Sequence, residues 1–523
     1  MSVLSTAVAT AYENRAQWHP AFSRPTRRKA QKSSGFRAYG TYRHCIKDNV
    51  LIDPCMGSGH ILVYMFDVLM QIYTSQGYIE RDAASLILQN NLYGLDIDDR
   101  AAQLAYFAVM MKARQYDRRF FSRNVQPHVY ALPETKGKLS ACSHEFGLGE
   151  QLYSAFHDGK EYGSLLDIGM GEAELNLLKM HIDDMLMNGD MTDIAAANVV
   201  EPLWDVAMAL TQKYDAVITN PPYMGASNMN PTLNKYIKDK FADYKSDFFS
   251  AFIVHAMSMA KRDGYLGFFS PYVWMFIQSY EKMRYKLYND CTIETLIQFE
   301  YSAFEEATVP VCTFAFRNSP IRGKKGCYFR LTDFRGGMEV QRQKTLEAIS
   351  DHNCGFYYEQ CSDNFIKIPS APVAYWVSDA IFSSFDLQHA SEYISPRIGL
   401  VTGDTDRFLR LWFEVEHQKI KWDCCTEAES IASKKKWFPY QKGGSYRKWY
   451  GNNEYIINWE NGGWECKNDN FSGTRVKSHN YNDDYAFRQA LTWTKISSGD
   501  FACRYVGNGF MFDDAGPICT INR

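Results

Sequence analysis

The residues best suited to chemistry are Asn220, Pro221, Pro222 and Tyr223, which follow the apolar run 214–219. Two prolines stiffen the backbone and remove two N–H donors, so nearby carbonyl groups remain as hydrogen-bond acceptors. The Asn220 side-chain oxygen and the Pro221 carbonyl can each accept one hydrogen of an exocyclic amine, while Tyr223 can stack on the ring. The pattern predicts a pocket for a planar ring with an amino group. The alternative is a simple turn that ends a strand.

A second motif, Asp53-Pro54-Cys-Met-Gly57-Ser-Gly59, joins the apolar run 49–53 to a segment with helical periodicity. Two glycines let the backbone turn sharply and approach a ligand closely. The spacing is not G-x-G-x-x-G, and no P-loop lysine follows, which disfavours a dinucleotide or a triphosphate. The alternative is an ordinary strand-to-helix turn.

An acid follows at the end of the next predicted strand. Asp96 stands where such folds bind the ribose of a nucleoside. Asp98 points to the other face by alternation, so we expect Asp98 or Asp99 to cap the helix that begins near Ala101. A helix cap is also the alternative role for Asp96.

These motifs need a sheet to position them. Strands are predicted at 49–53, 92–98, 128–132, 214–219, 264–269, 293–299 and 311–316, with helical segments between several of them. Alternation of strands and helices predicts a doubly wound α/β sheet. Residues 135–212 are interpreted as an insertion of loops and helices. Glu134 is the nearest candidate for an acidic residue at the end of the third strand.

The two motifs in this order resemble the S-adenosylmethionine-dependent amino-methyltransferases of DNA. The stretches 57–64, 91–102 and 220–225 are similar to the PglX-like adenine-specific methyltransferases of BREX phage-defence systems, and 399–408 resembles their recognition domain. The resemblance implies a Rossmann-like S-adenosylmethionine-dependent methyltransferase domain, followed by a mixed α+β target-recognition domain.

The resemblance also implies roles for the residues. Asp53, Pro54, Gly57 and Gly59 would shape the pocket for S-adenosylmethionine, and Asp96 would hold its ribose. Asn220, Pro221, Pro222 and Tyr223 would be the catalytic residues, acting on an adenine flipped out of double-stranded DNA. No metal and no membrane are expected; other BREX proteins are expected partners.

The net charge of −3 hides an uneven distribution. Residues 1–47 hold nine Lys or Arg and one acid, residues 317–346 hold eight and two, and residues 434–450 hold six and none. Such blocks favour one basic face. Lys434, Lys435, Lys436, Arg447 and Lys448 alternate with aromatic residues and are predicted to bind DNA. The alternative is a solvated basic loop over an aromatic core.

The expected organisation is a basic, irregular segment at 1–47, a catalytic domain at 48–335, and an incomplete target-recognition domain at 336–523. In such enzymes a segment before the glycine loop usually closes over the cofactor, and it is not found in 1–47. PglX-like proteins are also longer at both ends, so the resemblance implies that the chain is truncated at both ends. The 13 cysteines form no C-x-x-C pair, and no secretory signal is evident, which favours the cytoplasm.

Two other functions remain open from the sequence. An NPPY loop also serves enzymes that methylate a glutamine side chain of a protein or an RNA base. A truncated chain could instead bind DNA or a partner without catalysis.

Overall fold

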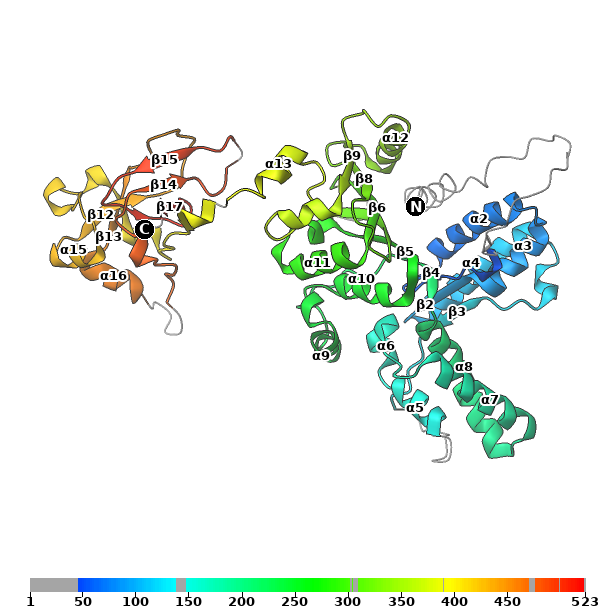
Figure 1. Cartoon of the computed structure of the whole chain (residues 1–523). Coiled ribbons are helices and arrows are strands. Elements are labelled where there is room, and N and C mark those ends of the chain that lie inside the picture. Colours follow the sequence, from blue (N-terminus) through cyan, green and yellow to red (C-terminus); the bar gives the residue numbers. More distant parts are fainter. Residues whose placement is uncertain are drawn as a thin grey trace. The chain divides into compact units, whose positions relative to one another are not determined.

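The computed structural model describes residues 46–137, 147–301, 303, 309–388, 390–469, 476–497 and 499–521. Residues 1–45 of the predicted basic segment lie outside the described residues. The chain divides into two compact units, Met1–Phe382 (unit 1) and Ser383–Arg523 (unit 2), shown in Figure 1.

Unit 1 is built on one nine-stranded sheet with the order β3-β2-β1-β4-β5-β7-β6-β8-β9. The strands are β1 (Leu51–Asp53), β2 (Leu92–Asp96), β3 (His128–Ala131), β4 (Tyr214–Thr219), β5 (Ala260–Pro271), β6 (Thr292–Gln298), β7 (Val311–Arg317), β8 (Lys325–Arg330) and β9 (Tyr357–Cys361). The strands from β3 to β5 are parallel, and β7 runs antiparallel between β5 and β6. The predicted doubly wound α/β sheet is therefore confirmed.

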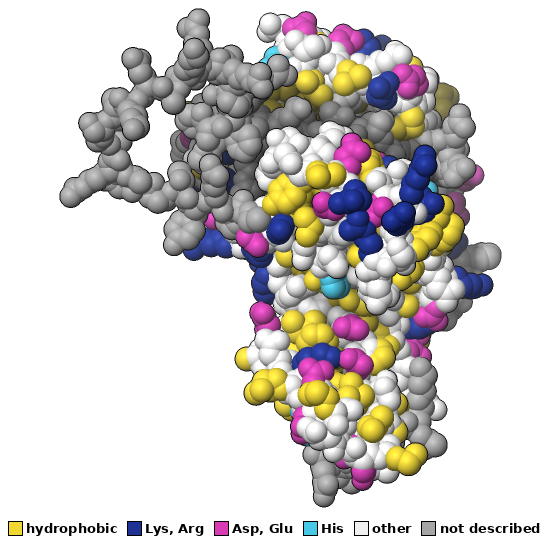
Figure 2. Space-filling model, turned by 90° about the vertical axis from the view of Figure 1, so that its right-hand side faces the viewer, with side chains coloured by type: hydrophobic (Ala, Val, Ile, Leu, Met, Phe, Trp, Pro, Cys, Tyr) yellow, Lys and Arg dark blue, Asp and Glu magenta, His cyan; other side chains and the backbone are white. Residues whose placement is uncertain are grey.

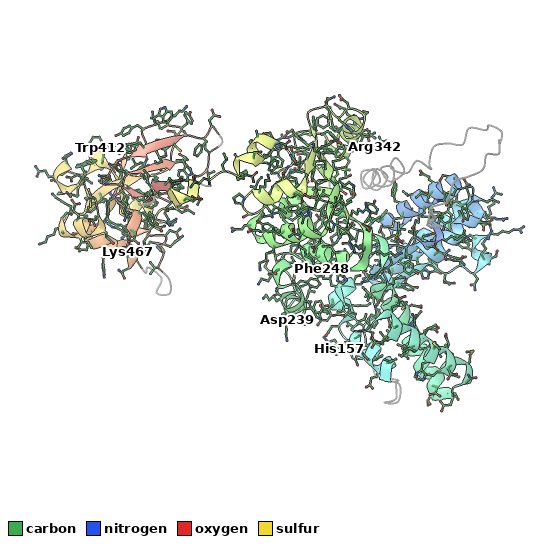
Figure 3. All side chains as sticks on the ribbon, viewed as in Figure 1. His157, Asp239, Phe248, Arg342, Trp412 and Lys467 are labelled. Atoms are coloured by element: carbon green, nitrogen blue, oxygen red, sulfur yellow. The ribbon has the colours of Figure 1, made fainter. Side chains whose placement is uncertain are left out.

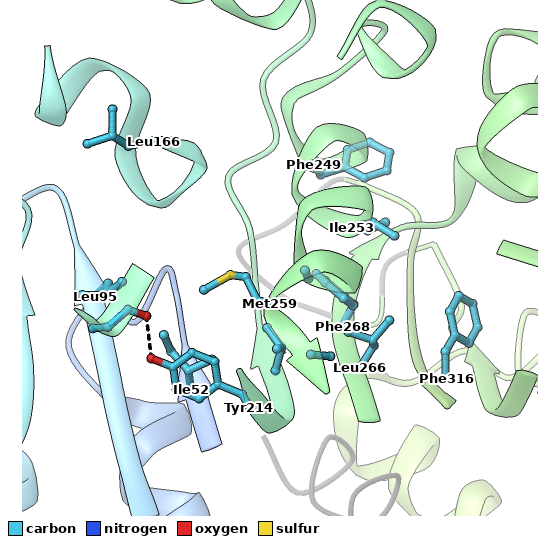
Figure 4. Packing of buried hydrophobic residues seen from close by; sticks show 14 of the residues in the cluster. Ile52, Leu95, Leu166, Tyr214, Phe249, Ile253, Met259, Leu266, Phe268 and Phe316 are labelled. Atoms are coloured by element: carbon cyan, nitrogen blue, oxygen red, sulfur yellow. Dashed lines mark hydrogen bonds between the residues drawn. The ribbon is translucent and has the colours of Figure 1, made fainter. Parts of the chain in front are cut away.

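Helices bury both faces of this sheet. α2 (His60–Ser75), α3 (Glu80–Leu86) and α4 (Asp99–Tyr116) share one apolar core with β2 and with Ile218 of β4. On the other face, α10 (Phe248–Met259) packs on Ile52, Val217 and Leu266. Figure 4 shows this second core, including Tyr214, whose hydroxyl donates to the Ala209 carbonyl at 2.5 Å. Neighbouring residues of β4 enter opposite cores, as strand alternation requires.

The described part of the predicted insertion is helical. It contains α5 (Gly147–Ala155), α6 (Gly159–Tyr162), α7 (Glu172–Asn188) and α8 (Met191–Thr211). By length and composition alone, α8 could cross a membrane. Its Ala196, Val200 and Leu203 are instead buried in the core of unit 1, which accounts for its apolar composition.

Unit 1 extends past residue 335, where the sequence places the start of the second domain. α12 (Gly337–Ser350) follows β8, and β9 then pairs antiparallel with β8. Farther along, the Arg284 side chain of α11 (Glu281–Asp290) binds the carbonyl groups of Ser370 and Ala371. Strand pairing and these hydrogen bonds hold the segment to unit 1, so the units divide at Phe382 and Ser383.

Unit 2 has two four-stranded sheets, and its mixed α+β character agrees with the predicted class. The sheets have the orders β10-β17-β14-β15 and β11-β13-β12-β16. Their strands are β10 (Ile394–Arg397), β11 (Leu409–Leu411), β12 (Trp437–Gln441), β13 (Tyr455–Asn458), β14 (Ala490–Trp493), β15 (Cys503–Val506), β16 (Met511–Phe512) and β17 (Ile518–Ile521). The longer helices are α15 (Glu427–Ala432) and α16 (Glu460–Lys467). Phe438, Tyr440, Ile457 and Trp459 form the centre of its core.

Arg284 gives a direct test of how residues 370–371 are held. Its side chain is 0% exposed and also donates to the carbonyls of Trp274 and Ile277, at 2.7 and 2.8 Å. Arg284→Ala leaves these buried carbonyl groups without partners, so we expect the free energy of unfolding of unit 1 to fall by about 3 kcal/mol or more. Urea unfolding followed by tryptophan fluorescence measures this loss.

Lys282→Ala on the same helix is the matched control. Its ion pair with Asp243 lies at the surface, and such pairs contribute roughly 0–1 kcal/mol. Equal losses in the two variants would contradict a role for Arg284 in holding residues 370–371.

Candidate functional site

The predicted motifs meet at one edge of the sheet, at the point where strand order reverses. β2 and β3 lie on one side of β1, whereas β4 and β5 lie on the other. β1 and β4 pair in parallel, with Ile52 opposite Val217, so Asp53 and Thr219 end at the same edge. Ligands of open α/β sheets bind at this kind of switch point.

The glycine loop has the backbone conformation that its sequence predicts. Gly57 and Gly59 have φ of 52° and 81°, values that side chains disfavour. A Cβ at Gly59 would lie 2.9 Å from the Cα of Ala105, so Gly59 lets α2 approach α4. A Cβ at Gly57 would meet nothing within 4 Å, so the loop is open there.

Asp96 ties this loop to the end of β2. Its Oδ2 accepts the Gly57 N–H at 2.9 Å, and its Oδ1 accepts the Asp98 N–H at 2.9 Å. Asp98 caps α4 by accepting the Arg100 N–H at 2.8 Å, which confirms the predicted cap. Each Asp96 oxygen keeps a lone pair for a ligand hydroxyl, and the neighbouring Ile97 is 50% exposed.

Asp53 is a buried acid with an unused oxygen. It is 0% exposed, and its Oδ1 accepts the Cys55 N–H at 3.1 Å. Its Oδ2 and the neighbouring Thr219 hydroxyl are buried, and neither makes a hydrogen bond of good geometry among the described residues. Burial raises the pKa of Asp53 to about 7, although the nearby Thr219 hydroxyl and then the Cys55 N–H favour the charged form. An orphaned carboxylate at this edge fits a polar or cationic group of a ligand.

The Asn220–Tyr223 segment, which follows β4 at the same edge of the sheet, is held by hydrogen bonds of its own. The Tyr223 hydroxyl donates to Asn220 Oδ1 at 2.8 Å and to the Phe269 carbonyl at 3.2 Å. Burial raises the pKa of Tyr223, so the hydroxyl stays a donor at neutral pH. Tyr223 as a whole is 38% exposed, and its ring meets the Phe249 ring edge to face, with the ring centres 6.4 Å apart. The amide oxygen is thus oriented and retains one lone pair.

Two residues that the sequence analysis missed hold these loops. Asp247, which caps α10, accepts the Met224 N–H at 3.1 Å and so fixes the chain just after Tyr223. Ser164, 2% exposed, donates from its hydroxyl to the Pro54 carbonyl. Ser164 lies in the predicted insertion, which therefore contributes to the site. An N-cap signal could have found Asp247, whereas no local signal marks Ser164.

The predicted DNA-binding residues all lie in unit 2, in two groups on either side of β12 in the chain. Lys434, Lys435 and Lys436 precede β12, whereas Arg447 and Lys448 lie in the segment after its end. The five residues of β12, roughly 17 Å long at about 3.3 Å per residue, stand between the two groups along the chain. Figure 2 shows a face of unit 1 where Lys and Arg lie among Asp and Glu.

Comparison with known proteins shows which families this chain resembles. Residues 90–304 match the Eco57I restriction-modification methylase family. This region runs from the end of the helical segment before β2 through the Asn220–Tyr223 loop to β6. It therefore covers Asp96 and the predicted catalytic residues.

Individual relatives extend the match. The chain is 37% identical over 506 residues to the adenine-specific methyltransferase PglX of Lacticaseibacillus casei (strain Zhang), covering 91% of this chain and 41% of PglX. It is 35% identical over 500 residues to the adenine-specific methyltransferase BrxX of Escherichia coli O9:H4 (strain HS), covering 89% of this chain and 40% of BrxX. The predicted relationship to PglX-like methyltransferases is confirmed, and the chain spans about two fifths of the length of these relatives.

Solved structures that match this chain at low sequence identity include two restriction-modification enzymes. The Type IIL enzyme MmeI in complex with DNA has a TM-score of 0.44 and 12% identity, over 90% of this chain and 57% of that chain. A nuclease-deletion mutant of the Type ISP enzyme LlaGI, in complex with a DNA substrate mimic, has a TM-score of 0.46 and 12% identity, over 90% of this chain and 39% of that chain.

Asp53 predicts a pH dependence of stability. Its folded pKa of about 7 lies above the unfolded value, so between about pH 4 and 7 the folded chain binds more protons and stability falls as pH rises. Asp53→Asn lacks this titration. The free energy of unfolding of the variant should therefore increase relative to that of the wild type as pH rises, by up to about 4 kcal/mol above pH 7. Thermal unfolding of both proteins at pH 5 and pH 8 measures this change. The same difference in stability between variant and wild type at the two pH values would contradict the prediction.

Proposed function

We propose that this chain transfers a methyl group from S-adenosylmethionine to N6 of an adenine flipped out of double-stranded DNA. One observation carries the proposal: the Asp53–Gly59 loop and the Asn220–Tyr223 loop extend from neighbouring parallel strands at one sheet edge. A cofactor on the first loop and an amine on the second would be adjacent. Such positioning is a large part of what this transfer requires.

The residues of the first loop fit the cofactor. The orphaned Asp53 Oδ2 suits the ammonium group of the methionine part, and the open side of Gly57 admits the ligand close to the backbone. Asp96 has lone pairs for the ribose hydroxyls, and Ile97 offers an exposed apolar side chain for the adenine ring. Pro54 is held by Ser164 and shapes the turn. Bound S-adenosylmethionine supplies an electrophilic methyl group.

The second loop would activate the substrate amine. The N6 lone pair of adenine is delocalised into the ring, which makes it a weak nucleophile. Asn220 Oδ1 and the Pro221 carbonyl would accept the two amino hydrogens and favour charge on N6 as it attacks. Pro222 keeps this backbone rigid, and the exposed Tyr223 ring would stack on the flipped base. Tyr223 would give up its bond to Asn220 Oδ1, or share that oxygen with the amine.

Unit 2 would serve as the target-recognition domain. It contains the segment 434–450, which has six basic residues and no acid, as expected for binding phosphates. PglX and BrxX are named adenine-specific methyltransferases, which supports adenine as the target base. We place the reaction in the cytoplasm, with BREX proteins as partners, and assign no metal to it.

Methyl transfer from tritiated S-adenosylmethionine tests the proposal. We expect incorporation into duplex DNA and a loss of at least about a hundredfold in Asn220→Ala, because one of the two acceptors is removed. Asn228→Ala, an exposed position beyond the loop, is the matched control and should retain wild-type activity.

The same assay distinguishes the other substrate classes. Incorporation into protein or RNA in place of DNA would contradict the proposed substrate. Undiminished transfer by Asn220→Ala would contradict the assigned mechanism, and tight cofactor binding without any transfer would contradict catalysis by this chain.

A further inference from the structure

The basic residues of unit 2 fall into two groups with different surroundings. Many are neutralised by carboxylates: Lys467 pairs with Glu427 and Asp483, and Arg407 pairs with Glu465 and Asp469. Figure 3 labels Lys467 within this unit. Arg447 and Lys448 have no carboxylate within ion-pair distance among the described residues, so their charges are available to a partner.

These two cations belong to loop 442–452, which forms most of the connection between β12 and β13. Every residue from 444 to 450 is exposed. The Trp449 and Tyr450 side chains are each 71% exposed, and the Lys448 ammonium lies 5.2 Å from the centre of the Trp449 ring. Exposed aromatic rings beside cations mark a recognition surface, because their exposure gains nothing for folding.

The loop is nevertheless held in one conformation. The Trp449 N–H donates to the Cys503 carbonyl at 2.9 Å, and the Tyr505 N–H donates to the Trp449 carbonyl at 2.8 Å. Trp449 has a φ of 76°, a strained value for a bulky residue. The buried Asn452 amide donates to the Ser445 carbonyl at 3.2 Å. A fixed loop loses little entropy when it binds.

A buried cation lies beneath the loop. Arg504 of β15 is 1% exposed, and it pairs with Trp449 by an isolated β-bridge. Its Nε and Nη2 have no hydrogen-bond partner in the described structure. Among the described residues Arg504 makes no ion pair, although Glu454 lies within reach of its charge. A buried charge that is not ion-paired adds to the positive potential at the base of the loop, which favours a polyanionic partner.

The lysines before β12 have a structural explanation. Lys434 has a φ of 50°, and its N–H donates to the Ile431 carbonyl, so it ends α15 as a left-handed cap. The Lys435 ammonium donates a hydrogen bond to the Gln418 carbonyl. The pKa of Glu465 is lowered chiefly by its hydrogen bond with Arg407, and the charge of Lys436 nearby lowers it further. This group serves the fold in a region of mixed charge.

We propose that loop 442–452 is the element with which unit 2 holds duplex DNA. Arg447 and Lys448 contact phosphates, and Trp449 and Tyr450 pack against bases in a groove, whereas Lys434, Lys435 and Lys436 make no essential contact. The inference rests on the proposed function, because DNA is the polyanion that this function supplies.

Binding of the full chain to a labelled duplex library of random sequence tests the phosphate contacts. Arg447→Gln with Lys448→Gln should weaken binding and reduce the slope of log affinity against log salt by about 2, because each phosphate that is no longer neutralised lowers the slope by roughly 0.9. Lys434→Gln with Lys436→Gln removes the same charge and is the matched control. We expect it to change neither the affinity for the duplex nor the salt dependence of binding. Equal effects of the two double variants, or no effect of the loop pair, would overturn the proposal.

Trp449→Asn tests the ring contact. Asparagine tolerates positive φ, so the variant deletes the ring and keeps the loop conformation; an unchanged melting temperature checks this. We expect duplex affinity to fall by about tenfold or more. Wild-type affinity, or stronger competition by RNA than by duplex DNA, would overturn the assignment.

Methyl transfer measured in parallel separates the two proposals. A wild-type chain that binds duplex DNA without transferring a methyl group contradicts the proposed function alone. A wild-type chain that methylates DNA, while the loop variants bind as it does, contradicts the loop inference alone.

Discussion

The parallel pairing of β1 with β4 is the constraint on which the site depends. Residues 53 and 220 are far apart in the chain, yet their strands are neighbours and end at one edge of the sheet. The chain reaches this arrangement only after building β2, β3 and the helices of 147–211. Those elements bring the chain back to β1, and the described part of the insertion supplies the helix α8 that leads into β4.

Hydrogen bonds then turn this proximity into a defined geometry. The hydrogen bond from the Gly57 N–H to Asp96 joins the ends of β1 and β2. The hydrogen bond from Ser164 to the Pro54 carbonyl links the insertion to the glycine loop. Asp247 fixes the chain after Tyr223 by accepting the Met224 N–H. The buried Asp53 is the cost of this arrangement, because its raised pKa opposes ionisation in the folded chain. A residue with that cost fits a binding role better than a structural one.

The parts predictable from the sequence are those with local signals. Strand runs ending in Asp53, Asp96 and Asn220, and the Asp98 cap, can be read from a few neighbouring residues. Ser164 and Arg284 could not, because each acts on a carbonyl distant in the chain. The extent of unit 1 was missed for the same reason, since β9 follows a helix and joins the sheet only through β8. Charge counts found residues 434–450, but only the structure shows that the lysines before β12 have structural partners, whereas Arg447 and Lys448 have no ion pair among the described residues.

The central claim is that one site combines a methyl donor with an exocyclic amine of adenine. The most direct measurement is the identity of the product: duplex DNA is incubated with the chain and S-adenosylmethionine, digested to nucleosides, and analysed by mass spectrometry. The account predicts N6-methyladenine as the methylated base. Methylation of the cytosine amino group, or unmethylated DNA with the cofactor bound, would contradict it.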